Sequence, residues 1–295
     1  MIVDHVRRTC RQGSPGSISS HPAGPCSKQH LKESLVRIAT FGDLHLGPNI
    51  FSDRFQNDEE HLLRFDDHLR GSHDRIVLVG DIFQTDYGSR PGSRPEVLEA
   101  AMERYPRISN RWNSASCALI YGNHDAVIQE RMRAAKEIFL NDNGSRIWLT
   151  HGHHFDPLIS EGPIPFAFSW MMGQFRRMGR RSLADFLEGQ FFTTCQQMAR
   201  SLGSPMCAAQ NALLLGQYDI VIMGHTHQPD CVRFGNGVYA NSGACLPNQL
   251  GYISIDTLTK RVELREFQGN NRFRVVRSAL ATPSSICPHS LCWDG

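Results

Sequence analysis

The sequence predicts an α/β layered sandwich, and two observations support that prediction. Short runs rich in apolar and β-branched residues recur along the chain, and helical patterns separate the early runs. The later runs follow one another closely, which indicates a strand-rich C-terminal part. The chain has 295 residues, 40% of them hydrophobic and 20% charged, as expected of a globular protein with a substantial core.

Eight runs are predicted to be strands because apolar and β-branched side chains dominate them. They cover residues 35–41, 75–79, 116–121, 146–149, 218–223, 237–240, 252–256 and 261–267. Three segments between the early strands repeat apolar residues at helical spacing. Their markers are Leu62, Phe65 and Leu69, then Leu98, Ala101, Met102 and Tyr105, then Ile128, Met132, Ala135, Ile138 and Phe139. The third helix is expected to end near Asn141-Asp142-Asn143-Gly144, because Asn and Gly commonly terminate helices.

The two ends of the chain have the composition of tails. Residues 1–34 are rich in Ser, Gly and Pro and lack periodicity, so they are predicted to be a disordered N-terminal tail. Residues 278–295 are predicted to be a C-terminal tail for the same reason, which leaves one domain over residues 35–277. Within it, residues 157–216 break the alternation of strands and helices and are predicted to be an inserted helical lid.

Composition and charge restrict the class of protein. The net charge of +2 gives no general attraction to polyanions, so the sequence does not call for an obligatory nucleic-acid partner, and no protein partner is implied. The N-terminal residues lack the apolar core of a secretory signal, and the longest apolar stretch, residues 164–172, is too short to span a membrane. Nine cysteines without metal-type spacing fit reduced thiols. These features favour the cytoplasm, with peripheral contact at the inner face of the membrane as a further expectation.

Five polar motifs each follow a predicted strand. They are Gly42-Asp43-Leu44-His45, Gly80-Asp81, Gly122-Asn123-His124-Asp125, His151-Gly152 and Gly224-His225-Thr226-His227. In α/β folds, ligand chemistry gathers beyond the carboxyl ends of strands. Carboxylate and amide oxygens mixed with imidazoles suit Mn²⁺, Fe or Zn²⁺. The motifs therefore supply enough ligands for two such ions.

The ordered set of motifs resembles the calcineurin-like metallophosphoesterase superfamily. The resemblance spans residues 38–227 and extends to Asn241-Ser242-Gly243. It implies a four-layer fold in which two mixed β-sheets are flanked by helices. It also implies a phosphoester hydrolase that uses two divalent ions, with Mn²⁺ expected and Fe or Zn²⁺ as alternatives.

The resemblance assigns a ligand role to each matching position. One ion would be held by Asp43, His45 and His227, and the other by Asn123, His151 and His225. Asp81 would bridge both ions. A water between the ions would be ionised and attack phosphorus directly.

His124 matches the superfamily's non-ligand histidine, which implies that it protonates the departing oxygen. Several members orient that histidine with an aspartate three positions after the bridging one, whereas this chain has Gln84 there. Asp86 or Asp125 would have to substitute for it. Gln84 therefore argues against a Ser/Thr protein phosphatase.

The predicted lid combines aromatic residues and Met with an arginine cluster, Arg176, Arg177, Arg180 and Arg181. Such a surface would seat an acyl chain or membrane while the guanidinium groups bind phosphate. The alternative is a helix that packs on the core with solvated arginines. His153 is a further predicted substrate contact, with a solvated loop as its alternative.

The insertion between His151 and His225 resembles that of UDP-2,3-diacylglucosamine hydrolases, which cleave a pyrophosphate in a nucleotide-sugar lipid. Those enzymes typically carry Arg at the position of His124. Despite this difference, the resemblance of the insertion favours a small-molecule or lipid-linked phosphoester of that kind as the substrate. A nuclease or cyclic-nucleotide phosphodiesterase is the alternative. A non-catalytic scaffold of the same fold is the third reading, although all seven ligand positions are intact.

Overall fold

The computed structural model describes residues 36–56, 58–156, 162–202, 204–245 and 249–282. The predicted N-terminal tail, residues 1–34, lies outside the described residues, as does most of the predicted C-terminal tail. No helix in the described part of the chain combines the length and the apolar character that crossing a membrane requires.

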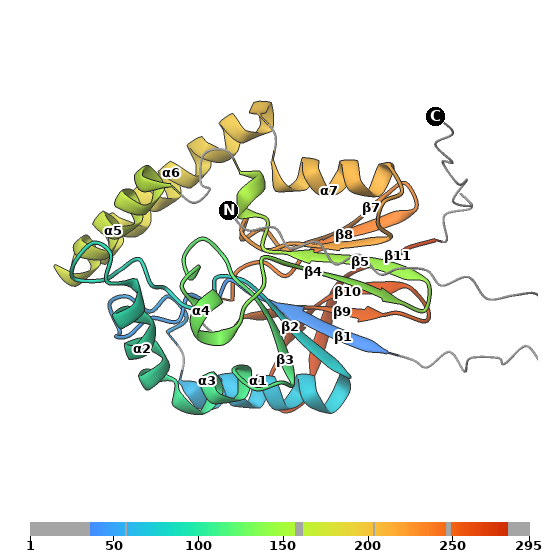
Figure 1. Ribbon diagram of the computed structural model, residues 1–295, viewed down its shortest axis with the longest axis horizontal. Coiled ribbons are helices and arrows are strands. Elements are labelled where there is room, and N and C mark those ends of the chain that lie inside the picture. The colour runs from blue at the N-terminus through green and yellow to red at the C-terminus, as the bar shows by residue number, and fades with distance from the viewer. Residues whose placement is uncertain (1–35, 57, 157–161, 203, 246–248, 283–295) are drawn as a thin grey trace, which may run out of the picture. The chain divides into compact units, whose positions relative to one another are not determined.

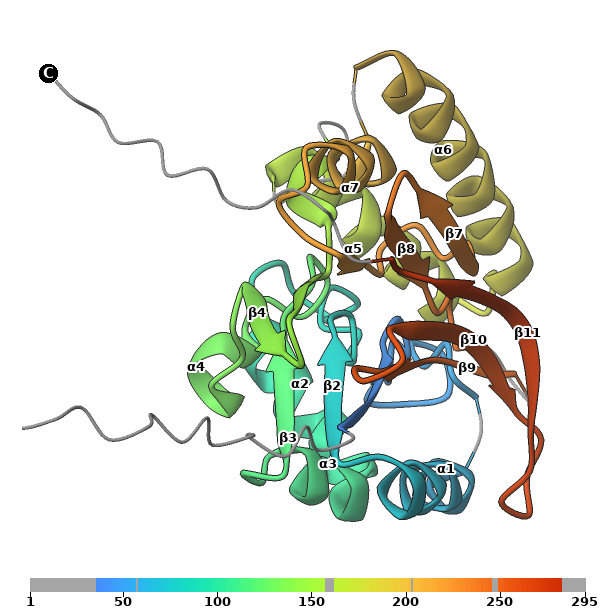
Figure 2. The same ribbon diagram turned by 90° about the vertical axis from the view of Figure 1, so that its right-hand side faces the viewer.

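Two mixed β-sheets form the centre of the fold (Figures 1 and 2). The six-stranded sheet has the order β11-β10-β9-β1-β2-β3, and its β1–β2 and β2–β3 pairs are parallel. Its strands are β1 (Arg37–Phe41), β2 (Arg75–Val79), β3 (Cys117–Ile120), β9 (Leu250–Asp256), β10 (Arg261–Phe267) and β11 (Phe273–Leu280). The five-stranded sheet has the order β4-β5-β6-β8-β7, and its β5–β6 and β6–β8 pairs are parallel. Its strands are β4 (Glu137–Asp142), β5 (Ser145–Thr150), β6 (Ile220–Ile222), β7 (Asp230–Phe234) and β8 (Gly237–Asn241).

Apolar side chains pack the two sheets against each other and against helices. Ile38, Val77 and Ile253 of one sheet meet Ile147 and Ile220 of the other in a buried layer. Helices α1 (Glu59–Ser72), α2 (Arg94–Arg104) and α3 (Pro106–Trp112) cover the outer face of the six-stranded sheet (Figure 1). Helix α7 (Pro205–Leu214) covers the outer face of the five-stranded sheet. The predicted sandwich of two mixed sheets flanked by helices is confirmed.

Local signals explain where the first helix starts and stops. The Asp58 carboxylate accepts the backbone N–H of His61 at 2.8 Å and so caps the N-terminus of α1. Glu59 and Glu60 in the first turn and Arg70 in the last complement the helix dipole. One face then buries Leu62, Phe65 and Leu69, the residues whose spacing predicts the helix.

The described part of the segment between β5 and β6 is mainly helical, and its helices pack in two different places. Helices α5 (Pro163–Arg177) and α6 (Arg181–Leu202) pack against each other beyond the strand ends, and we call them the cap (Figure 1). By contrast, Ala209 and Leu213 of α7 pack on Val221 and Tyr239 of the five-stranded sheet. Helix α7 is therefore an outer layer of the sandwich, although the predicted lid includes it.

The predicted third helix is wrong over most of its length. Helix α4 (Ile128–Met132) is short, and Ile138 lies in β4. Asn143 and Gly144, read as a helix terminus, have φ values of 46° and 68° and join β4 to β5. A pair of left-handed residues with the sequence Asn-Gly forms a tight hairpin turn, whose twist matches that of the strands.

The predicted C-terminal boundary at residue 277 is too early. Strand β11 continues to Leu280, and its Ser278, Ala279 and Leu280 pair with Glu263, Val262 and Arg261 of β10. Ala281 is buried beyond them. Strands β7 and β11 are not among the eight predicted strands. Both are edge strands with partly exposed faces, so their patterns lack a long apolar run.

Candidate active site

The five polar motifs meet at one end of the sandwich. Strands β1, β2 and β3 are parallel and end side by side, and β5 and β6 do the same in the second sheet. The turns after β1 and β2 are joined by backbone hydrogen bonds, from Asp43 N–H to the Gly80 carbonyl and from His45 N–H to the Asp81 carbonyl, both 3.0 Å. The sheet geometry therefore fixes the positions of the motif backbones relative to one another.

Five of the seven predicted ligands have a left-handed backbone. Their φ values run from 50° to 66°, and they are Asp43, His45, Asp81, His225 and His227. Each such conformation costs a non-glycine residue roughly 1–2 kcal/mol, so it persists only where the surroundings impose it. This turn of the chain directs the side chains inward from the strand ends.

Glycines let the strand ends approach each other closely. A β-carbon at residue 122 would overlap the carboxylate of Asp81. At residue 80, where φ is 81°, it would lie 2.5 Å from the His151 ring. Larger residues would push Asp81 and His151 out of place.

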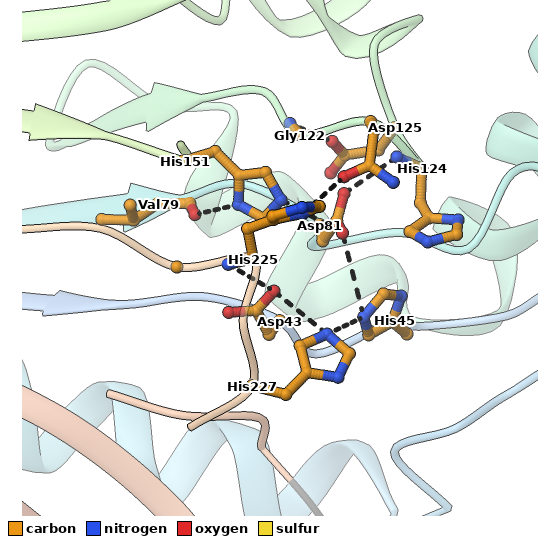
Figure 3. A network of polar contacts seen from close by, with 12 residues as sticks. Asp43, His45, Val79, Asp81, Gly122, His124, Asp125, His151, His225 and His227 are labelled. Carbon is orange, nitrogen blue, oxygen red and sulfur yellow. Dashed lines mark hydrogen bonds and ion pairs between the residues drawn. The ribbon is translucent and has the colours of Figure 1, made fainter. Parts of the chain in front are cut away.

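Four predicted ligands form a tight group, with one donor atom from each lying within 4.8 Å of the others (Figure 3). They are Asp43, His45, Asp81 and His227. His45 Nε2 lies 3.1 Å from His227 Nε2 and 3.9 Å from Asp81 Oδ2. His227 Nε2 lies 3.4 Å from Asp43 Oδ1.

The other three predicted ligands lie on the far side of Asp81. His151 Nε2 is 3.2 Å from Asp81 Oδ2. His225 Nδ1 is 3.1 Å from Asn123 Oδ1, and the His225 backbone N–H lies 3.3 Å from Asp43 Oδ1. All seven residues are thus brought together, and Asp81 stands between the two groups (Figure 3).

The donors fit metal ions, because several buried polar atoms are otherwise unpaired. Among the described residues, Asp43 Oδ2 is buried without a hydrogen-bond partner, and His151 Nε2 makes no hydrogen bond and has only the Asp81 carboxylate near it, at 3.2 Å. Two imidazole nitrogens at 3.1 Å would likewise be satisfied by a cation between them.

The charges of the site fit the same conclusion. Burial holds the pKa of His45 well below its usual value, which keeps the imidazole in the neutral form that binds metal. Burial alone would raise the pKa of Asp81, but His151 and His124 outweigh it and lower that pKa. The carboxylate between the two groups is therefore ionised.

Further hydrogen bonds orient the ligands from behind. The Val79 carbonyl lies 2.9 Å from His151 Nδ1 and fixes the ring so that Nε2 faces Asp81. Asn241 Nδ2 donates to the Gly224 carbonyl at 2.8 Å, and Asn241 Oδ1 accepts from Gly243 N–H at 2.8 Å. Asn241 and Gly243 of the Asn-Ser-Gly motif therefore support the turn that carries His225 and His227.

His124 lies next to Asp81 and is paired with Asp86. Its backbone N–H donates to Asp81 Oδ1 at 2.9 Å, and its Nδ1 is 2.9 Å from Asp86 Oδ2. Burial alone would lower the pKa of His124, but Asp81 and Asp86 raise it above its usual value. The imidazole is thereby held as a proton donor.

Of the two predicted substitutes for Gln84, Asp86 is the one that contacts the histidine. Asp125 instead accepts backbone N–H groups from Ile82 and Gly122, each at 2.7 Å. Gln84 is fully buried, and its amide has no hydrogen-bond partner in the described part of the chain.

The four cap arginines differ in what they contact. Arg176 is only 2% exposed, and its Nη2 lies 2.5 Å from Asp185 and 2.8 Å from Glu188. Arg177 donates to the Tyr87 carbonyl at 2.8 Å. Arg180 is exposed, and Arg181 lies 3.9 Å from Asp185. Arg176 is therefore a structural residue inside the cap, because its charge is buried and already compensated.

His153 is also placed differently from the prediction. It is buried, its ring centroid lies 5.4 Å from that of His151, and burial lowers its pKa to about 2. It therefore packs beside a predicted ligand as a neutral ring. Asp156, absent from the predicted site, has its Oδ2 3.3 Å from His225 Nε2. Asp156 belongs to no recognisable motif in the sequence.

A pocket with a cavity volume of about 50 Å³ opens beside the ligands. Asn123 and His124 form one part of its wall, and the cap residues Phe166, Phe168 and Phe191 form another. Arg54, also absent from the predicted site, lines the pocket and lies 3.6 Å from Glu188. The arrangement can place a phosphoryl group at the ligands and an apolar substituent under the cap.

The sequence model of the family described as calcineurin-like phosphoesterase matches residues 36–229, which include every predicted ligand. The chain belongs to the calcineurin-like phosphoesterase family. This membership confirms the superfamily resemblance and supports hydrolysis of phosphoesters in general. No match was found among curated proteins.

Several solved structures are similar to this calcineurin-like phosphoesterase at low identity. The phosphoesterase Yfce from E. coli is 15% identical, with 84% of this chain and 100% of that chain covered and a TM-score of 0.43. Vps29 complexed with Zn²⁺ from Entamoeba histolytica is 13% identical, with 83% and 98% covered and a TM-score of 0.43. An archaeal phosphodiesterase is 14% identical, with 79% and 100% covered and a TM-score of 0.38.

Proposed function

We propose that this calcineurin-like phosphoesterase is a binuclear metal-dependent hydrolase that cleaves a phosphodiester or pyrophosphate bond. The observation that carries the proposal is that six metal-type donors from five strand ends surround a seventh, Asp81, with His124 beside them. Buried carboxylates and imidazoles that lie this close to one another are better satisfied by a cation than by each other.

The donors divide into two sets around Asp81. Asp43, His45 and His227 would hold one ion, and Asn123, His151 and His225 the other. Two bound divalent ions, with Mn²⁺ the expected metal, would supply an activated water as nucleophile and neutralise charge on the phosphoryl oxygens.

The remaining groups of the site handle the leaving group. His124 would donate a proton to the departing oxygen, because its ring is held by Asp86 on one nitrogen and lines the pocket. Phe166, Phe168 and Phe191 make one side of the pocket apolar, which suits an apolar substituent of the substrate.

The favoured substrate is a nucleotide-sugar lipid or a similar amphiphilic phosphoester. The aromatic wall supports this choice, since Phe168 and Phe191 stack with ring centroids 4.2 Å apart at the pocket. The outer surface of the cap supports it as well, because Met178 and Phe186 are 67% and 61% exposed and lie close in the chain to the exposed Arg180. Apolar side chains beside a cation favour peripheral contact with a membrane surface.

A substrate panel tests the proposal. Protein loaded with Mn²⁺ would be assayed with a nucleotide-sugar lipid, cyclic nucleotides, single-stranded DNA and a phosphomonoester. We expect the highest kcat/KM on the lipid. A preference for DNA or cyclic nucleotides would support the nuclease or phosphodiesterase alternative. Two bound metals without hydrolysis of any of them would indicate a non-catalytic scaffold.

A further inference from the structure

Asp86 contacts two residues at once, one on each of its carboxylate oxygens. Oδ2 lies 2.9 Å from His124 Nδ1, and Oδ1 accepts from Arg94 Nη2 at 2.6 Å and from Arg94 Nε at 2.8 Å. Asp86 is 3% exposed, so neither contact is weakened by bulk water. Arg94 therefore determines how the Asp86 carboxylate is turned toward the imidazole.

The cap holds Arg94 from its other side. The guanidinium carbon of Arg94 lies 4.6 Å from the centroid of the Phe166 ring, over its face. Phe166 belongs to α5, whereas Arg94 is the first residue of α2. A continuous series of contacts thus runs from the cap to the imidazole of His124, through Phe166, Arg94 and Asp86.

The backbone of His124 is fixed independently of this series. Its N–H donates to Asp81, and its carbonyl accepts from the Thr85 hydroxyl at 2.5 Å. Changing Arg94 would therefore leave the backbone in place and free the ring and the Asp86 carboxylate to turn.

We propose that Arg94 is a positioning residue for proton donation by His124, acting through Asp86, and that Phe166 makes this alignment depend on the cap. The inference rests on the proposed function. It assigns the cap a role in the chemical step as well as in substrate binding. Poor leaving groups require the proton at bond cleavage and good ones do not, so the effect of Arg94 depends on the leaving group.

Two phosphodiesters that differ only in the leaving group test the role of Arg94. They are methyl phenyl phosphate and methyl p-nitrophenyl phosphate. Arg94→Gln should lower kcat about 10- to 100-fold for the phenyl ester and less than about 3-fold for the nitrophenyl ester, with KM little changed. Arg94→Lys keeps the charge but loses the planar fork and the stacking on Phe166, so its loss should be intermediate.

Arg104→Gln is a matched control on the same helix. Arg104 lies 3.1 Å from the buried Asp53, and its side chain is 26% exposed against 28% for Arg94. Arg104→Gln loses the same kind of ion pair as Arg94→Gln, but neither Arg104 nor Asp53 contacts His124. Both esters should keep wild-type rates. Equal losses on the two esters in Arg94→Gln would overturn the proposal.

The cap contact has its own matched pair. Phe166→Leu removes the ring from Arg94, whereas Phe168→Leu removes a neighbouring pocket ring that stacks on Phe191. We expect Phe166→Leu to slow the phenyl ester at least about 5-fold more than the nitrophenyl ester. Phe168→Leu should change both by the same factor. The same response in both variants would refute the role of the cap.

A readout without turnover separates this inference from the proposed function. In protein labelled with ¹⁵N-histidine, the His124 Nδ1–H that donates to Asp86 should give a far-downfield proton resonance. It should shift or broaden in Arg94→Gln and stay unchanged in Arg104→Gln. An unchanged resonance in Arg94→Gln would overturn the inference. Failure of the metal-loaded wild type to hydrolyse either ester would overturn the proposed function, while this resonance still tests the alignment.

Discussion

The ligand end of the sandwich and the cap use charged residues in opposite ways. At the ligand end, five strand ends direct carboxylates and imidazoles to one place, and the buried Asp43 Oδ2 has no hydrogen-bond partner. In the cap, Arg176 is buried but already paired with Asp185 and Glu188. In the sandwich, the charged side chains are therefore arranged to bind a ligand. In the cap, the buried charge of Arg176 forms ion pairs that stabilise the cap itself.

The backbone of the ligand end is also more constrained than that of the cap. The ligands sit on left-handed turns between hydrogen-bonded strands, where the sheets leave them little freedom. The cap consists of two helices in one continuous insertion, with contacts to Tyr87 and Arg94 beneath it. The sheets thus fix the positions of the predicted ligands, whereas the cap is a separate helical element that meets the sandwich through side-chain contacts.

Replacing Asp81 should give the largest effect. We expect Asp81→Ala to abolish hydrolysis and remove both metals, because Asp81 stands between the two ligand groups. Elemental analysis and a turnover assay check this. Asp219→Asn, which removes a buried carboxylate paired with Arg146 away from the ligands, should retain the metals. Two equivalents of metal in Asp81→Ala would refute the bridging role.

Replacing His124 should separate chemistry from metal binding. His124→Ala should keep its metal content, because the imidazole is not among the donors, and lose about 10²- to 10⁴-fold in kcat on esters with poor leaving groups. Steady-state kinetics with the phenyl and nitrophenyl diesters measure this. An undiminished rate on the phenyl ester would be incompatible with proton donation.

Replacing Arg176 tests the structural role of charge in the cap. Arg176→Met removes one partner of a buried ion pair and leaves Glu188 less compensated, which should lower the free energy of unfolding by about 3 kcal/mol. Thermal denaturation measures it. The exposed Arg180, changed to Gln, is the control and should shift stability by less than about 0.5 kcal/mol. Instead, Arg180→Gln should weaken binding to anionic vesicles.

Metal loading should stabilise the ligand end by a smaller amount. An ion present at 100 times its Kd adds about 2.7 kcal/mol to the free energy of unfolding. The melting temperature should therefore rise with Mn²⁺ and fall again with a chelator. Arg176→Met should show the same rise from a lower starting point, and Asp81→Ala should show none. A rise in Asp81→Ala equal to that of the wild type would place the metal elsewhere.

The sequence predicts the ligand end well because each strand places its motif at a defined point. The order of the motifs predicts which side chains meet, and the sheets bring those side chains together. The role of the cap arginines is harder to predict. The acidic partners of Arg176, Asp185 and Glu188, follow in the next helix, beyond the arginine cluster that indicates a phosphate site. Arg54 and Asp156 stand alone in the sequence and become part of the site only through folding.

The errors in the predicted secondary structure also arise because contacts distant in the sequence decide the outcome. Ile128 and Met132 belong to a real but short helix, and Ile138 continues their spacing by coincidence although it lies in β4. Asn143-Gly144 suits either a helix end or a hairpin turn, and only pairing with β5 decides between them. Edge strands such as β11 bury too little apolar surface to stand out from a tail.

The place where the cap joins the sandwich has a consequence for how the chain can change. The cap departs after β5 and the chain returns through α7 to β6, and these two strands are direct neighbours in parallel register. An insertion between adjacent strands can be lengthened, shortened or exchanged without altering any other pairing in the sheet. Helices α5 and α6 could therefore be exchanged for another helical pair while the sheets and the metal ligands stay in place, but the new pair would have to replace the contact of Phe166 with Arg94 to keep His124 aligned.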